Sequence, residues 1–71
     1  MADSVYKFIE LVGTSSESWE KAAAAAVTQA SKSVRDLRVA EIVQLDVAIE
    51  NGKIKSYRAK VKLSFKLESK G

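Results

Sequence analysis

The sequence contains no cysteine, no histidine and no proline. Without cysteine and histidine, the chain cannot form disulfides, cannot use either residue as a nucleophile or base, and lacks the usual zinc ligands. Its 71 residues allow one domain at most. We therefore expect a single domain over residues 1–71 without cysteine or histidine chemistry.

Long hydrophobic runs are also missing. The longest nearly uncharged stretch, Ala22 to Ser31, is too short and too rich in alanine to span a bilayer. The first residues do not show a charged region followed by an apolar segment and a cleavage site. We expect a cytoplasmic protein that does not contact a membrane.

The energy balance of so short a chain predicts an assembly. Apolar residues make up 46% of the sequence and charged residues 30%, which is an ordinary globular composition. Ordering costs about 1.5 kcal/mol per residue, and a core in a chain below about 80 residues rarely supplies a net of more than about 3–5 kcal/mol. Because neither disulfides nor an obvious metal cage is available, we expect self-association to supply the rest.

The first half of the chain predicts a strand followed by a helix. Residues Val5 to Val12 carry apolar side chains on both faces, so we expect both faces to be covered and the strand to end at Gly13. Thr14-Ser15-Ser16-Glu17 has the pattern of a capping box, where a helix begins. The apolar stripe of that helix is Trp19, Ala22, Ala23, Ala26, Val27, Ala30 and Val34.

The second half predicts a long hairpin. Apolar residues alternate at odd positions from Leu37 to Ile49 and again from Lys53 to Leu67. A two-residue Asn51-Gly52 turn would place odd residues opposite even ones, whereas a three-residue loop, Glu50-Asn51-Gly52, keeps the apolar faces together. We therefore predict the longer loop, and an α+β subunit of order β-α-β-β in which a three-stranded antiparallel sheet wraps the helix. The predicted pairs are Ile49 with Lys53, Leu45 with Tyr57, Val43 with Ala59 and Leu37 with Phe65.

The even-numbered face of this hairpin carries the best candidate site. The predicted register places Gln44 opposite Arg58, with Arg58 diagonal to Asp46, so that an amide, a guanidinium and a carboxylate converge. This cluster suits a planar polar ligand or a contact across a subunit boundary. The alternative is a solvated strand face with weak cross-strand pairs.

Other polar features predict no catalysis. Glu41 interrupts the apolar face and needs a basic partner or exposure. No second carboxylate stands at a spacing for acid–base chemistry, so we expect no enzymatic activity.

A row of basic residues could bind phosphate or nucleic acid. Two observations weaken this function: Tyr57 and Phe65 lie on the other face, where they cannot stack on bases bound by the row, and lysines on a strand also prevent aggregation of sheet edges. The row consists of Lys53, Lys55, Arg58, Lys60, Lys62 and Lys66. We expect Trp19 to serve packing rather than ligand stacking.

Several segments of the chain resemble the dodecins. They are Val5-Tyr6-Lys7, Glu10-Leu11-Val12-Gly13-Thr14-Ser15, the alanine-rich helix, Ala40-Glu41-Ile42-Val43, Tyr57-Arg58-Ala59-Lys60-Val61 and Phe65-Lys66-Leu67. The resemblance implies β-α-β-β subunits, twelve of which form a hollow shell. It also implies a store for flavin, FMN or riboflavin, held between subunits, and no catalysis.

Two positions depart from the flavin-binding pattern. Val39 stands where the resemblance implies a tryptophan that stacks on the flavin, and Arg58 stands where it implies a glutamine. Arg58 can only donate hydrogen bonds, whereas an amide also accepts them. The resemblance therefore implies an altered flavin-type site, and we assign the ligand zone to Val39, Gln44, Asp46 and Arg58.

The combination of Arg38-Val39-Ala40, Ser18-Trp19-Glu20 and Tyr57-Arg58 is similar to the calcium dodecin branch. Calcium takes about six to eight oxygen ligands. Glu41 and Asp46 are the metal candidates, and they would supply enough oxygens only if symmetry brings copies together. An ion-binding or purely structural shell therefore stands as the alternative to flavin storage.

Overall fold

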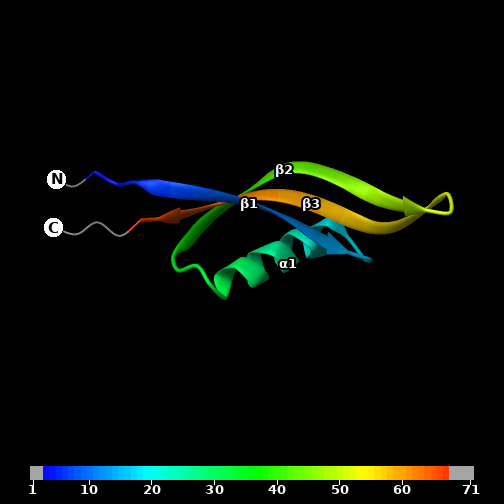
Figure 1. Ribbon diagram of the computed structural model, residues 1–71, viewed down its shortest axis with the longest axis horizontal. Coiled ribbons are helices and arrows are strands. Elements are labelled where there is room, and N and C mark those ends of the chain that lie inside the picture. Colours follow the sequence, from blue (N-terminus) through cyan, green and yellow to red (C-terminus); the bar gives the residue numbers. More distant parts are fainter. Residues whose placement is uncertain (1–2, 68–71) are drawn as a thin grey trace.

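A computed structural model of the protein describes residues 3–67. Its elements are β1 (Tyr6–Ser15), α1 (Trp19–Ser31), β2 (Leu37–Glu50) and β3 (Lys53–Lys66). The strands form one antiparallel sheet in the order β1-β3-β2, and α1 packs on one face of it, mainly over β1 and β3 (Figure 1). The predicted α+β fold of order β-α-β-β is confirmed.

Gly13 does not end β1, as the sequence suggested, but lies within it, because the strand continues to Ser15. A Cβ atom at Gly13 would stand 2.0 Å from the carbonyl oxygen of Ala22 and 3.1 Å from the Cβ of Ala26. The glycine is therefore needed for the close approach of α1 to the sheet and not for a turn.

The start of α1 also differs from the predicted one. The helix begins at Trp19, and its N-cap is Ser18, whose hydroxyl accepts a hydrogen bond from the Lys21 backbone N–H at 3.0 Å. The hydroxyl of Ser15 instead accepts from the Glu17 backbone N–H at 3.0 Å. The predicted capping box at Thr14 to Glu17 is therefore wrong, because these residues complete β1 and turn the chain.

The β2–β3 hairpin closes through a two-residue turn, Asn51-Gly52, so the predicted three-residue loop is wrong. Glu50 pairs with Lys53, and both Asn51 and Gly52 have positive φ angles, 54° and 76°, as a type I′ turn requires. The mixing of faces is avoided because the register shifts at three places: near Lys55, at Val43 and at Arg38. Each shift inserts one unpaired residue and reverses the alternation.

These shifts change the predicted pairs and faces. Leu37 pairs with Phe65 as predicted, but Leu45 pairs with Ala59 and Ile49 with Ile54. Val39 pairs with Ser64, and Glu41 pairs with Lys62. Opposed residues of an antiparallel pair point to the same side. Val39 and Glu41 therefore lie on the face away from α1, and the predicted place of Glu41 among apolar side chains is wrong.

We call the sheet face against α1 the inner face and the opposite one the outer face. The core on the inner face is small, because four of its six buried apolar residues are alanines: Ala22, Ala26, Ala30, Ala59, Val61 and Leu63. Tyr6, Phe8 and Val12 of β1 lie on the outer face, and each is about half exposed. Within one chain, the expected cover on both faces of β1 is therefore not present.

Candidate functional site

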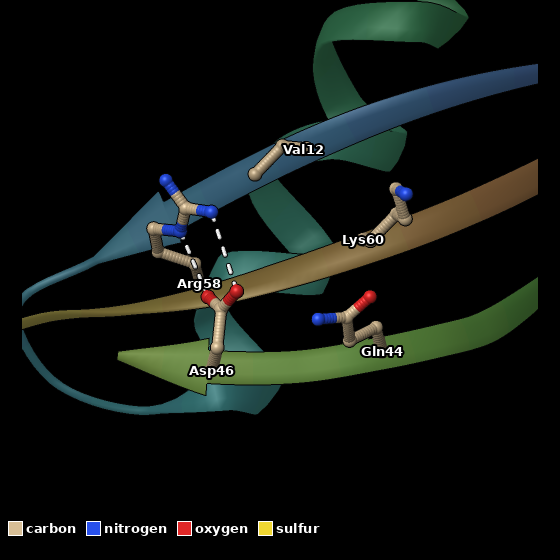
Figure 2. A pocket seen from close by; sticks show the side chains of 5 residues that line it. All are labelled: Val12, Gln44, Asp46, Arg58 and Lys60. Atoms are coloured by element: carbon tan, nitrogen blue, oxygen red, sulfur yellow. Dashed lines mark hydrogen bonds and ion pairs between the residues drawn. The ribbon is translucent and has the colours of Figure 1, made fainter. Parts of the chain in front are cut away.

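Asp46 and Arg58 form an ion pair on the outer face, where β2 and β3 run side by side (Figure 2). The Arg58 Nε donates to Asp46 Oδ1 at 2.8 Å, and Nη2 donates to Oδ2 at 3.2 Å. The two residues face each other directly, and not diagonally as the predicted register implied. This two-point contact fixes the plane of the guanidinium group.

The pair changes the acidity of both partners. The hydrogen bonds from Arg58 lower the pKa of Asp46 below its ordinary value, with a further contribution from the nearby positive charges of Arg58 and Lys60. The same contact with Asp46 raises the pKa of Arg58. At neutral pH, the site therefore holds a fixed negative charge beside a fixed positive one.

Gln44, Lys60 and Val12 complete a small cavity next to this pair (Figure 2). Lys60 is paired with Val12 of β1 and with Gln44 of β2. These three residues form one cross-strand row on the outer face, next to the cross-strand row that holds Arg58. The cavity has a volume of about 140 Å³. The structure thus brings together three of the four predicted ligand residues, although Gln44 lies opposite Lys60 and not opposite Arg58.

Val39, the fourth predicted residue, lies elsewhere on the outer face. It pairs with Ser64, two rows beyond the row of Lys60, and its side chain is 61% exposed. One chain therefore presents Val39 and Arg58 as separate parts of the face, and they could meet at one ligand only through two copies.

The metal candidates are also separated within one chain. Glu41 is opposite Lys62, whereas the carboxylate of Asp46 is held by Arg58. Residues 3–67 contain no group of three or more acidic side chains that could hold a metal ion. Within one chain, Glu41 and Asp46 therefore do not form a calcium site together.

Sequence patterns did not reveal that Trp19 connects the helix to this site. Its indole Nε1 donates to the backbone oxygen of Asp46 at 3.0 Å. Its ring meets the Tyr57 ring edge to face, with centroids 5.1 Å apart at an angle of 74°. No residue spacing predicts this contact, because it joins positions 27 residues apart.

Trp19 also borders an apolar groove between α1 and β2. The groove has a volume of about 340 Å³ and is lined by Trp19, Glu20, Ala23, Ile42 and Leu45. Ile42 and Leu45 are nearly half exposed, because α1 leaves the inner face of β2 largely uncovered. One chain thus presents an apolar surface on its inner face as well as on its outer face.

The distribution of cations and aromatics differs from the prediction in one respect. Arg58, Lys60, Lys62 and Lys66 share the outer face with Tyr6 and Phe8 of β1, which pair with Lys66 and Ser64. Tyr57 and Phe65 of β3 lie on the inner face, away from these cations, as predicted. The prediction considered only β3, and β1 adds Tyr6 and Phe8 to the outer face.

Comparisons of the sequence and of the structure with known proteins identify the same family. The dodecin family model matches residues 5–68. Calcium dodecin from Mycobacterium tuberculosis is 52% identical over 65 residues, covering 90% of each chain. Its crystal structure gives a TM-score of 0.81 at 49% identity, with 96% of this chain and 97% of that chain covered.

Two further relatives extend the comparison. The dodecin of Thermus thermophilus is 39% identical over 64 residues, covering 90% of this chain and 93% of that one. The dodecin of Streptomyces coelicolor has a TM-score of 0.90 at 36% identity, with 99% of this chain and all of that chain covered. Among residues 3–67, no helix is long and apolar enough to cross a membrane.

Proposed function

The chain belongs to the dodecin family, and we propose that it is the subunit of a non-catalytic homododecamer that binds and stores a small ligand. The observation that carries the proposal is the outer-face cavity, in which Gln44, Asp46, Arg58 and Lys60 converge. Hydrogen bonds between their side chains hold Asp46 and Arg58 together, and strand pairing places Gln44 and Lys60 beside them. A fixed polar arrangement of this kind suits binding more than chemistry.

The size of the cavity supports a site shared between copies. Pockets for small organic ligands usually have volumes of about 300–1,000 Å³, whereas this cavity has about 140 Å³. One chain therefore supplies part of such a site. A second copy that places its own outer face against the first would enclose a ligand of the size of a flavin.

The residues fit a flavin only in part. Arg58 uses Nε and Nη2 on Asp46, and its remaining N–H groups can donate to a carbonyl oxygen of the ring. At position 39 the chain offers an aliphatic side chain instead of an aromatic one. FMN or riboflavin would therefore meet a donor-rich site altered at Val39 and Arg58, and these are the positions that set its affinity.

The proposal is tested by light scattering together with a titration of riboflavin fluorescence. We expect a particle near twelve times the subunit mass of 7.7 kDa, and quenching that saturates with added protein. Val39→Trp combined with Arg58→Gln should bind more tightly than the unchanged chain. A monomer or dimer would refute the assembly, and the absence of quenching in both proteins would refute the flavin site.

A calcium-binding shell is the second candidate, because the M. tuberculosis relative with 52% identity bears the name calcium dodecin. Glu41 is the metal candidate whose carboxylate forms no ion pair with a described residue. If calcium binds between copies, a chelator should lower the melting temperature and calcium should restore it. Glu41→Gln should abolish the difference, and a melting temperature indifferent to calcium would exclude this function. The cytoplasmic location expected from the sequence stays a prediction.

A further inference from the structure

The end of the β2–β3 hairpin projects from the rest of the subunit. The last residue of β1, Ser15, pairs with Tyr57, so β3 has only β2 as a neighbour between Lys53 and Ser56. This end of the hairpin also extends past α1 (Figure 1). We call residues 48–56 the hairpin arm. The arm is a two-stranded ribbon, and such a ribbon is at best marginally stable in water without further contacts.

The hairpin arm exposes a pair of large apolar side chains. Ile49 lies opposite Ile54, and the two side chains are 68% and 56% exposed. Ile49 is three residues beyond Asp46 of the outer face, and successive side chains of a strand alternate between faces. Ile49 and its partner therefore point to the inner face, where their own chain does not cover them.

The groove between α1 and β2 lies on the same inner face and is suited to such a pair. Its volume is about 340 Å³. β2 contributes Ile42 and Leu45 to its lining, and α1 contributes Trp19 and Ala23. The arm does not fill the groove of its own chain, because β2 runs extended from Leu45 to Ile49, a distance of about 13 Å. The arm of a second copy is free of this restriction.

The charges of the two surfaces are complementary. Glu20 lines the groove, and its carboxylate forms no ion pair within residues 3–67. On the arm, Glu50 forms an ion pair with Lys55 at 3.5 Å. Lys53 is then the cation of the arm that has no ion pair among the described residues. Opposite charges of this kind steer two surfaces together and fix their orientation.

We propose that the hairpin arm of one copy inserts into the α1–β2 groove of a second copy, with Ile49 and Ile54 against its apolar lining and Lys53 beside Glu20. The inference rests on the homo-oligomer of the proposed function and names the surfaces through which its copies meet. The occupant is a second copy because both complementary surfaces belong to this one chain. Every copy carries an arm and a groove, so the contact can repeat from copy to copy until the assembly closes.

Cross-linking tests this contact directly. The sequence contains no cysteine, so introduced thiols are the only ones present. The variant with Glu20→Cys and Lys53→Cys is treated in its assembled state with a short bifunctional maleimide and analysed on a denaturing gel. We expect covalent dimers and larger multiples of the 7.7 kDa chain, whereas each single variant stays at the mass of one chain.

The matched control combines Lys53→Cys with Lys32→Cys. Lys32 is the C-cap of α1, about 18 Å along the helix from Glu20, so a thiol at position 32 lies beyond the reach of an arm seated in the groove. We expect this control to give no multiples of the chain.

Two sets of substitutions test the apolar and the charged parts of the contact separately. Ile49→Ser with Ile54→Ser should raise the protein concentration needed for assembly about tenfold or more, as loss of a central apolar contact does. Ile49→Val with Ile54→Val keeps apolar side chains and should assemble like the unchanged protein. Glu20→Lys should also weaken assembly, and adding Lys53→Glu should restore it because the two charges are then exchanged. Light scattering over a dilution series measures each variant.

The outcomes separate this inference from the proposed function. If the unchanged protein assembles but Glu20→Cys with Lys53→Cys gives no more multiples than the control, the inference is wrong and the proposed assembly stands. Unchanged assembly of Ile49→Ser with Ile54→Ser overturns the inference as well. If the unchanged protein is a monomer in light scattering, the inference and the proposed assembly both fail.

Discussion

At the scale of single residues, the site depends on contacts that join distant parts of the chain. Arg58 is held by the Asp46 carboxylate, and the backbone of Asp46 is held by the Trp19 indole. The arrangement of this outer-face cluster therefore depends on Trp19, the first residue of α1. Trp19 acts through Asp46 and is a positioning residue.

Replacing Trp19 with phenylalanine should remove the hydrogen bond to Asp46 and keep a ring near Tyr57. We expect the free energy of unfolding to fall by about 0.5–1.5 kcal/mol, the net value of one such bond. Trp19→Leu should cost more, since it also removes the edge-to-face contact. Urea denaturation at one fixed protein concentration measures both. Equal stability of Trp19→Phe and the unchanged chain would show that the bond contributes nothing.

The Asp46–Arg58 pair should give a defined dependence on pH. Because the pKa of Asp46 is lowered in the folded state from its ordinary value of 3.8, the pair stabilises the fold fully above pH 3.8 and loses this effect as the pH falls through the lowered value. The difference in melting temperature between the unchanged protein and Asp46→Asn should therefore be constant near neutral pH and shrink below pH 3.8. A difference that grows on acidification would contradict the assignment. Both side chains are about 40% exposed or more, so the effect is small.

At the scale of the elements, α1 lies unusually close to β1 and β3. The helix contributes Ala22, Ala26 and Ala30 to the core, and Gly13 faces the backbone of Ala22. The alanine stripe in the sequence permits this closeness, because alanine side chains are small. It did not indicate that Gly13 serves the same purpose, because a glycine after an apolar run is also typical of a strand end.

Gly13→Ala should therefore destabilise the protein severely. The added Cβ would meet a backbone oxygen at 2.0 Å, and α1 would have to move away. We expect a loss of about 3 kcal/mol or more, at the upper end for overpacking. Gly52→Ala is the matched control, since no atom lies within 4 Å of its added Cβ and only the positive φ of 76° opposes it. It should cost about 1–2 kcal/mol. A loss for Gly13→Ala that does not exceed that of Gly52→Ala would disprove the close contact.

The hairpin shows why strand pairing was harder to predict than strand existence. The sequence predicted β2 and β3 correctly to within a residue or two, because long alternating segments are a strong signal. The pairing of Asp46 with Arg58 depends on single unpaired residues near Lys55 and at Val43. A β-bulge has no fixed sequence pattern, and each one moves every later residue to the other face.

At the scale of the whole molecule, one chain is extended. Its radius of gyration is 15.0 Å, compared with about 11 Å for a compact domain of this length. Its accessible surface is 5534 Å², compared with about 4,300 Å² for a monomer of this mass. Large apolar side chains are exposed on both faces of the sheet. These quantities support the proposed assembly.

A charge placed in the groove between α1 and β2 tests whether this groove is part of a contact between copies. Leu45→Glu should give a particle of lower mass in light scattering, since an unpaired carboxylate would then have to be buried. Lys21→Glu, on the exposed side of α1, is the matched control and should keep the mass. An unchanged mass for Leu45→Glu would show that the groove faces solvent in the assembly.

The sequence alone determined the number, type and order of the elements, the alanine stripe and the polar residues near Asp46 and Arg58, and it predicted an assembly. These properties follow from composition and from periodicity along the chain, which are local. The tertiary structure decided which residues share a face. In it, Val39 and Glu41 lie on the outer face, Asp46 is opposite Arg58, and Phe8 lies beside Lys62. Such neighbours depend on bulges and on the pairing of strands that are distant in the sequence, and only the folded sheet fixes them.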